Sequence, residues 1–294
     1  MRKLSLLLLL CIILPLTLVS CGTEHDFVDF SYSINLKSDY AFVYYPESGQ
    51  ATYFGDEEQR VYPASTTKLL TILAALEILP ADELITPGDE VYMVESGSSS
   101  AYIRPHHTLT LEMLAEGMLL PSGNDAAYAV AAACGYVLLD DSDAEYTDAV
   151  ERFVEYMNEY ATSIGCTGSH FTTPDGYAND EHYSTLHDMA LISKLASDNE
   201  IITKYAALES DDVVYASLHT NTWTNTNKML DKDSKYYRKN IVGLKTGSLD
   251  DYYNLIALYD DGERRFIVGV FGSDTDDGRY KDVLNIIKCE NLFK

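Results

Sequence analysis

The stretch Pro63-Ala64-Ser65-Thr66-Thr67-Lys68 is followed at once by the apolar residues 69–76, and it decides the fold. The apolar run predicts a buried helix that begins near Ser65 and ends before Pro80. Positions i and i+3 share one face of a helix, so Lys68 is expected to lie beside Ser65. A hydroxyl next to an amine is typical of a nucleophile with its base. The same spacing also occurs where a serine only caps a helix and the lysine is exposed.

The first twenty residues predict a signal peptide. Arg2 and Lys3 precede the mainly apolar residues 4–18, and small residues stand before Cys21. This pattern resembles a bacterial lipoprotein signal, in which Cys21 is lipidated and becomes the new N-terminus. The alternative is an uncleaved membrane anchor, but the apolar run is short for a span and stops at polar residues 22–24.

The charge balance excludes some partners. The 294 residues carry a net charge of −25, and loss of residues 1–20 leaves 19 basic against 46 acidic residues, a net charge of −27. Such a surface repels phosphate backbones, so we expect no nucleic-acid partner. Attachment to the cell membrane would come from lipid on Cys21, outside the cytoplasm, and not from a basic patch.

Cysteines and histidines predict neither a disulfide framework nor a metal site. After residue 21 the cysteines are Cys134, Cys166 and Cys289, an odd number without a Cys-x-x-Cys pair. The histidines lack the i, i+4 spacing of a helical zinc pair. We therefore expect no metal and no cofactor.

Periodicity predicts a sheet made from both ends of the chain, with helices between. Extended segments are expected at residues 27–36, 40–45, 50–54, 213–216, 240–247, 252–259 and 265–272. Helices are expected at residues 65–79, 110–120, 125–134, 148–164, 185–196, 201–208 and 280–292, with Gly135 ending the third. The fold class is α/β (α+β): residues 21–37 form a tether and a first extended segment, and residues 38–294 form one catalytic domain.

Three short motifs in a fixed order carry the chemistry. They are Ser65-x-x-Lys68, Ser122-Gly123-Asn124 and Lys245-Thr246-Gly247. Each one alone is weak, since turns and strand ends use the same residues. Their order and spacing resemble the active-site serine penicillin-recognising enzymes, and within them the D-alanyl-D-alanine carboxypeptidases of the low-molecular-mass penicillin-binding proteins, serine peptidases of the S11 type.

The resemblance extends from about residue 38 to residue 290. It includes residues 62–68, 120–127, 157–158, 171–176, 182–185, 188–190, 225–228 and 243–247. It implies a DD-peptidase/β-lactamase-like fold, a substrate that ends in D-Ala-D-Ala, and β-lactams as covalent inhibitors.

The resemblance also gives each motif residue a role. Ser65 is the nucleophile, Lys68 its base, and Ser122 relays a proton to the leaving amine. Burial and the charge of Lys245 are expected to lower the pKa of Lys68 from about 10.4. Asn124 binds Lys68 and the substrate backbone.

The last motif is expected to bind the end of the substrate. Lys245 and Thr246 face the terminal carboxylate, and Gly247 permits close approach of the backbone. The N–H of Ser248 would complete an oxyanion hole with that of Ser65. Arg265 is a further candidate for the carboxylate, or a solvent-exposed arginine at a hairpin.

Two alternatives remain open at this point. A class A β-lactamase shares the fold but typically has Ser-Asp-Asn and a deacylating Glu, which residues 172–180 lack. A non-catalytic lipoprotein that binds muropeptides or β-lactams is the other. Many of these carboxypeptidases continue into a second β-rich domain and a membrane-binding helix, so we expect that anchoring here has moved to the N-terminal lipid.

Overall fold

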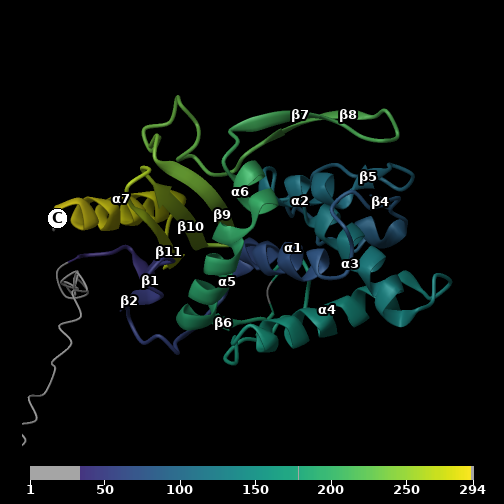
Figure 1. Cartoon of the computed structure of the whole chain (residues 1–294), viewed down its shortest axis with the longest axis horizontal. Coiled ribbons are helices and arrows are strands. Elements are labelled where there is room, and N and C mark those ends of the chain that lie inside the picture. The colour runs from purple at the N-terminus through teal and green to yellow at the C-terminus, as the bar shows by residue number, and fades with distance from the viewer. Residues whose placement is uncertain (1–33, 178, 293–294) are drawn as a thin grey trace, which may run out of the picture.

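Strands from the N-terminal and C-terminal parts of the described chain form one sheet. The computed structural model describes residues 34–177 and 179–292. Its main sheet is antiparallel, with five strands in the order β2-β1-β11-β10-β9. These strands are β1 (Ser38–Tyr45), β2 (Gln50–Phe54), β9 (Ile241–Leu249), β10 (Tyr252–Asp260) and β11 (Arg265–Ser273). Because β1 pairs with β11, the predicted sheet from both chain ends is confirmed (Figure 1).

The sheet has a separate core on each face. Along β1, Ala41 and Val43 pack with α7 (Asp276–Leu292), whereas Phe42 and Tyr44 belong to the larger core that contains the other helices. This division follows from the alternation of side chains along a strand. Figure 1 shows α7 at one side of the sheet and the helical region at the other.

Helix α1 lies at the centre of the helical region. Leu69, Leu70, Ile72 and Ala74 have no solvent exposure, as expected for a helix that is apolar all round. It contacts four of the helices around it (Figure 1). The helices are α1 (Lys68–Leu76), α2 (Leu111–Leu119), α3 (Asn124–Leu139), α4 (Tyr146–Ser163), α5 (Leu186–Asp198) and α6 (Glu200–Ala206), with 3-10 turns η1 (Ala64–Thr67) and η2 (Asp89–Tyr92).

Three short ladders complete the fold. They are β3 (Arg60–Val61) with β6 (Ser184–Thr185), β4 (Leu84–Ile85) with β5 (Leu109–Thr110), and β7 (Ser210–Val214) with β8 (Thr220–Thr224). The sequence did not predict β8, because its mainly polar residues show no apolar alternation. Trp223 on β8 is buried and donates a hydrogen bond from Nε1 to the Ala101 carbonyl (3.0 Å), which fixes the hairpin to the body of the protein.

Several predicted helix ends were wrong. Helix α1 ends at Leu76 and not at residue 79, and α7 begins at Asp276 because two aspartates occupy its first turn, where acids are favoured. Helix α3 continues through Gly135 to Leu139. A Cβ on Gly135 would lie 1.8 Å from the Ala149 carbonyl oxygen of α4, so this glycine allows two helices to touch and does not end one.

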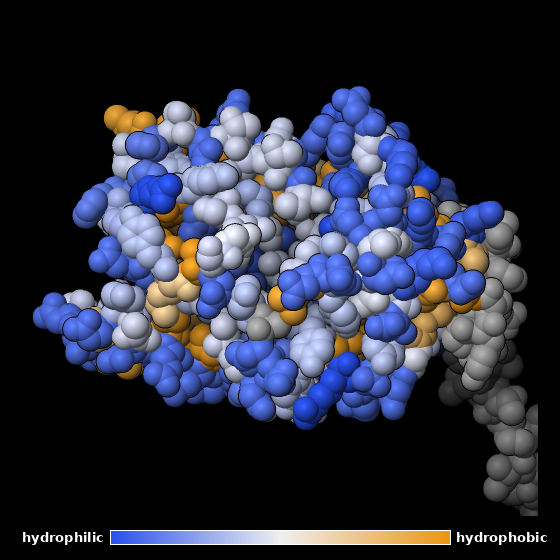
Figure 2. All heavy atoms as spheres, turned by 180° about the vertical axis from the view of Figure 1, so that it is seen from behind, coloured by the Kyte–Doolittle hydropathy of each residue, from blue (hydrophilic) through white to orange (hydrophobic). Residues whose placement is uncertain are grey.

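The surface agrees with the acidic composition. Figure 2 shows one face with mostly hydrophilic side chains and small, separate apolar areas. Across residues 34–177 and 179–292, no helix has the length and apolar character needed to cross a bilayer. The predicted signal peptide, Cys21 and most of the 27–36 segment lie outside the described residues, and residues 34–37 precede β1 without forming a strand.

The α3–α4 contact gives a stability prediction. Gly135→Ala gains up to about 1 kcal/mol of helix propensity. It also pushes a methyl group into the backbone of Ala149, and overpacking of this kind costs about 3 kcal/mol. We expect the substitution to lower the free energy of unfolding by about 2 kcal/mol in urea titrations.

The matched control is Val137→Ala, because Val137 lies on the same helix and is 54% exposed. Its midpoint of unfolding should stay close to that of the wild type. A Gly135→Ala protein as stable as the wild type would contradict the close contact of α3 and α4.

Candidate active site

The ammonium group of Lys68 is completely buried and binds three acceptors. Nζ lies 2.8 Å from Ser65 Oγ, 2.7 Å from Asn124 Oδ1 and 2.9 Å from the Asp175 carbonyl oxygen. A lysine ammonium has three N–H donors, so each donor has one acceptor. The acceptors come from η1, from the start of α3 and from the loop before β6. Lys68 therefore joins three segments that are distant in sequence.

Burial lowers the pKa of Lys68 to about 8, while the carboxylates of Asp175 and Asp125 act in the opposite direction. The sequence-based expectation that the charge of Lys245 also lowers this pKa was wrong, because burial alone accounts for the downward shift. With a pKa of about 8, roughly a tenth of Lys68 is neutral at pH 7. A neutral amine has a lone pair, and Ser65 Oγ is within reach to give it a proton.

Ser65 is the accessible residue of its turn. Ala64, Thr66 and Thr67 are buried, whereas Ser65 is partly exposed. The Pro63 carbonyl accepts hydrogen bonds from the Thr66 N–H (3.2 Å) and from Thr66 Oγ1 (2.6 Å), which holds the turn closed. Ala64 has a φ of +48°, a costly conformation for a non-glycine residue, and such residues cluster at functional sites. The predicted start of the helix at Ser65 holds, although the first turn is a 3-10 turn.

A buried histidine fixes the loop that contains Asp175. The Thr172 N–H donates to His182 Nδ1 (3.1 Å), so the ring proton lies on Nε2, which donates to Thr67 Oγ1 (3.0 Å). Burial lowers the pKa of His182 to about 4, so the ring is neutral at physiological pH. The histidine thus ties residues 172–177 to the start of α1, beside Lys68.

The second motif forms the turn between α2 and α3. Ser122 is buried with a φ of +62°, and Asn124 two residues later binds Lys68. The Asp125 carboxylate accepts hydrogen bonds from the backbone N–H groups of Ala101 and Ile103, both at 2.8 Å. The small-residue loop before Ala101 is therefore held against this turn.

The third motif lies on β9, which is one of the two edge strands of the main sheet. Lys245 is buried, and its pKa is lowered well below the usual value by burial and by the charges of Lys68 and Arg279. A Cβ on Gly247 would lie 2.9 Å from the Pro63 carbonyl oxygen, so this glycine lets β9 pack directly against the start of the turn that contains Ser65. Thr246 Oγ1 lies 2.5 Å from Thr226 Oγ1.

The structure does not bring Arg265 to this site. Its Nη1 binds Asp198 Oδ1 at 3.1 Å, its Nη2 binds the Ser197 carbonyl, and it also lies near Asp260. Arg265 is the first residue of β11, and Lys245 aligns with Gly269 across β10. The arginine is therefore at the other end of the sheet, where it stabilises the end of α5.

Sequence analysis missed two residues that support β9. Arg279 on α7 is buried, and its Nη1 donates to the Gly247 carbonyl (2.9 Å) and to Ser248 Oγ (3.1 Å). Thr226 binds Thr246, and its N–H donates to the Leu120 carbonyl (3.1 Å) just before Ser122. Thr226 was part of the quoted pattern without a role. No pattern in the sequence around Arg279 indicates that its side chain contacts β9.

The described residues offer no metal site. No group of three or more His, Cys, Asp or Glu side chains among residues 34–177 and 179–292 is arranged to hold an ion, and Cys134, Cys166 and Cys289 are free. The site thus consists of two buried lysines, a partly exposed serine, a buried serine and the side-chain amide of Asn124 at the start of α3, beside the edge strand β9. This set suits acyl transfer to a serine.

Comparison with known proteins agrees with this site. Residues 29–275 match the peptidase S11 family of D-alanyl-D-alanine carboxypeptidases, and the chain belongs to that family. It is 29% identical to the carboxypeptidase DacF of Bacillus subtilis over 248 residues, which are 82% of this chain. The chain spans only 59% of the length of DacF.

Solved structures show the same fold. The DD-transpeptidase of Streptomyces K15 superposes with a TM-score of 0.76 at 26% identity, covering 87% of this chain and 97% of that one. Penicillin-binding protein D2 of Listeria monocytogenes, in its ampicillin-bound form, gives a TM-score of 0.68 at 25% identity, covering 87% and 98%. The predicted DD-peptidase/β-lactamase-like fold is therefore confirmed.

The lowered pKa of Lys68 predicts how the reactivity of Ser65 depends on pH. Ser65 attacks an electrophile fastest when Lys68 is neutral, so labelling by a fluorophosphonate should speed up as pH rises through about 8 and then level off. Lys68→Arg keeps a permanent positive charge and should reduce the rate by at least about a hundredfold. The labelling rate is measured from about pH 6 to about pH 10, where unperturbed lysine is still largely charged.

The control is Lys194→Arg, because Lys194 lies on the surface of α5 and pairs with Asp198. This variant should show the same dependence of the labelling rate on pH as the wild type. A midpoint near the ordinary lysine pKa, or an active Lys68→Arg protein, would contradict the assignment of Lys68 as the base.

Proposed function

We propose that this protein is a serine-type D-Ala-D-Ala carboxypeptidase that removes the terminal D-Ala from peptidoglycan stem pentapeptides. The observation that carries the proposal is the 2.8 Å contact between the partly exposed Ser65 Oγ and the buried Lys68 Nζ, whose pKa is lowered to about 8. Membership of the carboxypeptidase family supports it.

The reaction has two halves. Ser65 Oγ attacks the carbonyl carbon of the penultimate D-Ala while its proton passes to Lys68. The N–H groups of Ser65 and Ser248 stabilise the oxyanion. The C–N bond then breaks, a proton reaches the leaving amine through Ser122, and D-Ala departs. Water hydrolyses the remaining ester with Lys68 again as base, which frees the shortened peptide and restores Ser65.

The edge of β9 provides the binding surface for the substrate. An extended peptide can add to an exposed strand edge through backbone hydrogen bonds. The terminal carboxylate would lie by Lys245 and Thr246, and its negative charge would favour the protonated form of Lys245. The buried Arg279 lies directly behind Gly247. In this proposal Arg279 replaces Arg265 as the second positive charge near the carboxylate, and Asn124 binds the substrate backbone.

β-Lactams are expected to acylate Ser65 because they present a reactive carbonyl and a carboxylate in similar positions. The ampicillin-bound structure of the Listeria relative supports this expectation. Fast hydrolysis of the drug would need a further base at the ester. Residues 172–177 contain no glutamate, and Asp175 contributes its carbonyl to Lys68, so the β-lactamase alternative finds no support here.

Release of D-Ala tests the proposed activity. Purified protein is incubated with Nα,Nε-diacetyl-L-Lys-D-Ala-D-Ala, and free D-Ala is measured. We expect turnover by the wild type and a loss of at least about a thousandfold in Ser65→Ala, because the nucleophile is absent. Ser248→Ala keeps the backbone N–H and should retain most of the activity. Absence of D-Ala release from folded wild type, or rapid hydrolysis of penicillin without it, would remove the carboxypeptidase proposal.

We also propose that the protein is anchored outside the cytoplasm by lipid on Cys21. The support is the apolar segment of residues 4–18 with small residues before the cysteine. Two or more acyl chains give stable membrane binding, so no basic surface is required. The net charge of −27 that remains after loss of residues 1–20 is consistent with attachment through lipid.

Fractionation of cells tests the anchor. Wild type should be found in the membrane fraction and incorporate a palmitate label, whereas Cys21→Ser should do neither, since its hydroxyl is not a substrate for lipidation. Cys11→Ser is the matched control, because Cys11 lies inside the apolar segment. Retention of label by Cys21→Ser would show that the lipid, if present, is elsewhere.

A further inference from the structure

The loop before β6 brings a buried carboxylate close to Lys68. Asp175 on this loop is 1% exposed, and its carbonyl oxygen lies 2.9 Å from Lys68 Nζ. Three bonds separate the carboxylate carbon from the carbonyl carbon, so at standard bond lengths the carboxylate carbon lies at most about 8 Å from the ammonium. The interior screens charges far less than water does, so a carboxylate at this distance acts on the ammonium.

Contacts on both sides of Asp175 hold this residue against α1. Thr71 Oγ1 of α1 donates a hydrogen bond to the Pro174 carbonyl (2.6 Å). On the other side, Gly176 has a φ of +82°, and a Cβ there would lie 1.9 Å from the Ala64 carbonyl oxygen. The loop therefore contacts both α1 and the 3-10 turn before it, and Asp175 is fixed between these two contacts.

The carboxylate of Asp175 has an incomplete set of hydrogen bonds. Its Oδ1 accepts a hydrogen bond from the Tyr177 N–H (2.9 Å). Its Oδ2 is buried and has no hydrogen-bond partner among residues 34–177 and 179–292. A buried charge is costly unless an opposite charge compensates for it. The ammonium of Lys68, which binds the carbonyl of the same residue, is placed to compensate for this one.

Three nearby side chains add little charge around this pair. His182 is neutral, and burial with the charge of Asp175 raises the pKa of the Tyr128 phenol on α3, so Tyr128 is neutral as well. Burial and the charge of Lys68 lower the pKa of Lys245 on β9 well below its usual value, which disfavours a second positive charge here.

Asp125 on α3 is the other acid that acts on Lys68, and it raises the pKa of that amine as Asp175 does. The carboxylate oxygens of Asp125 already accept three backbone N–H groups, those of Ala101, Ile103 and Ala126. Its charge is therefore largely compensated by hydrogen bonds, whereas that of Asp175 is not.

We propose that Asp175 is a positioning residue for acyl transfer, whose carboxylate stabilises the ammonium form of Lys68 while this lysine holds the proton taken from Ser65. The inference deepens the proposed function and rests on Lys68 as its base. When Ser65 Oγ attacks the carbonyl carbon, its O–H bond breaks and the proton binds the lone pair of Lys68 Nζ. Positive charge thus develops beside the carboxylate as the transition state forms, and an interaction that strengthens at this stage raises kcat.

The pH dependence of fluorophosphonate labelling tests the role of Asp175. Asp175→Asn removes the charge, while its amide oxygen can still accept the Tyr177 N–H. The ammonium of Lys68 is then less stable, so the midpoint of the labelling rate should move down by about one pH unit. The rate on the plateau at high pH should fall severalfold, because the amine is a weaker base. A fall at every pH with an unchanged midpoint would show a merely structural role and overturn the proposal.

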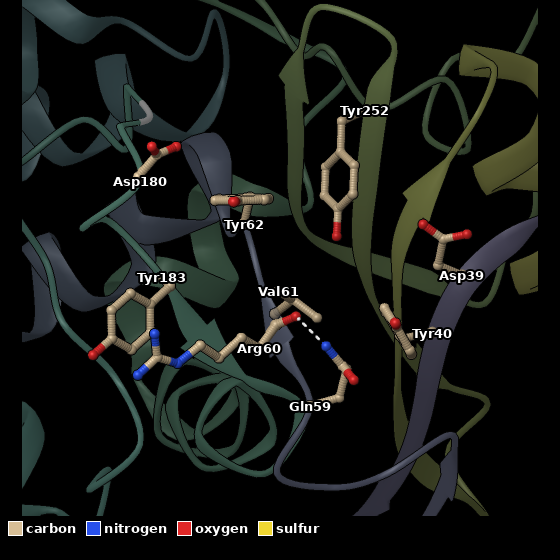
Figure 3. Close-up of a pocket in the computed structure, with 9 residues that line it drawn as sticks. All are labelled: Asp39, Tyr40, Gln59, Arg60, Val61, Tyr62, Asp180, Tyr183 and Tyr252. Atoms are coloured by element: carbon tan, nitrogen blue, oxygen red, sulfur yellow. Dashed lines mark hydrogen bonds between the residues drawn. The ribbon is translucent and has the colours of Figure 1, made fainter.

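The matched control is Asp180→Asn. Asp180 is the next acid of the same loop, but it is exposed and lines a pocket together with Tyr62 and Tyr183 (Figure 3). Water and salt screen an exposed charge, so its removal should leave the midpoint at the wild-type value. An equal shift in both aspartate variants would overturn the proposal, since it would then report the charge of the whole loop.

Titration of Lys68 itself separates this inference from the proposed function. Ser65→Ala cannot be acylated, so the NMR signal of Lys68 Cε, identified by its loss in Lys68→Arg, follows the amine alone. Adding Asp175→Asn to Ser65→Ala should lower the midpoint by about one pH unit. Asp175→Ser provides the same measurement where the asparagine variant does not fold, since its hydroxyl can also accept the Tyr177 N–H. An unchanged or higher midpoint overturns the proposal, whether or not the wild type releases D-Ala.

Discussion

The structure depends on placing the buried amine of Lys68 among three acceptors. An unpaired ammonium in the interior is very costly, so the segments that carry Ser65, Asn124 and the Asp175 carbonyl must all be in place around it. The same burial lowers the pKa of Lys68 to about 8. The burial of Lys68 therefore requires these distant segments to lie together, and it also provides an amine that can accept a proton.

Several further hydrogen bonds hold those segments together. His182 ties the Asp175 loop to Thr67, and Asp125 holds the backbone at Ala101 and Ile103 beside Asn124. Arg279 and Thr226 connect β9 to α7 and to the turn before Ser122. His182, Asp125 and Arg279 are buried, and hydrogen bonds made in the protein interior are stronger than those exposed to water, so these contacts hold the segments in place. The positive φ of Ala64 persists because the surrounding contacts determine it.

Much of this arrangement could be predicted from the sequence. The sheet from both chain ends and the meeting of Ser65 with Lys68 follow from alternation and from the i, i+3 rule, which are local. Arg265 and Gly135 were misjudged because their partners are set by packing: Asp198 at the end of α5, and the backbone of Ala149 on α4. Arg279 is the opposite case. Nothing in the sequence around it indicated a role, yet it contacts β9 from the opposite face of the sheet. Local patterns give elements and motifs, and tertiary contacts decide which charged residue reaches the site.

The central claim is that the pair of Ser65 and Lys68 transfers acyl groups. Mass spectrometry of the protein after incubation with benzylpenicillin tests it most directly, with the adduct located by peptide mapping. The account predicts one penicilloyl ester on the peptide that contains Ser65, formed by wild type and absent from Lys68→Arg. An adduct on any other residue, or no adduct on folded wild type, would contradict it.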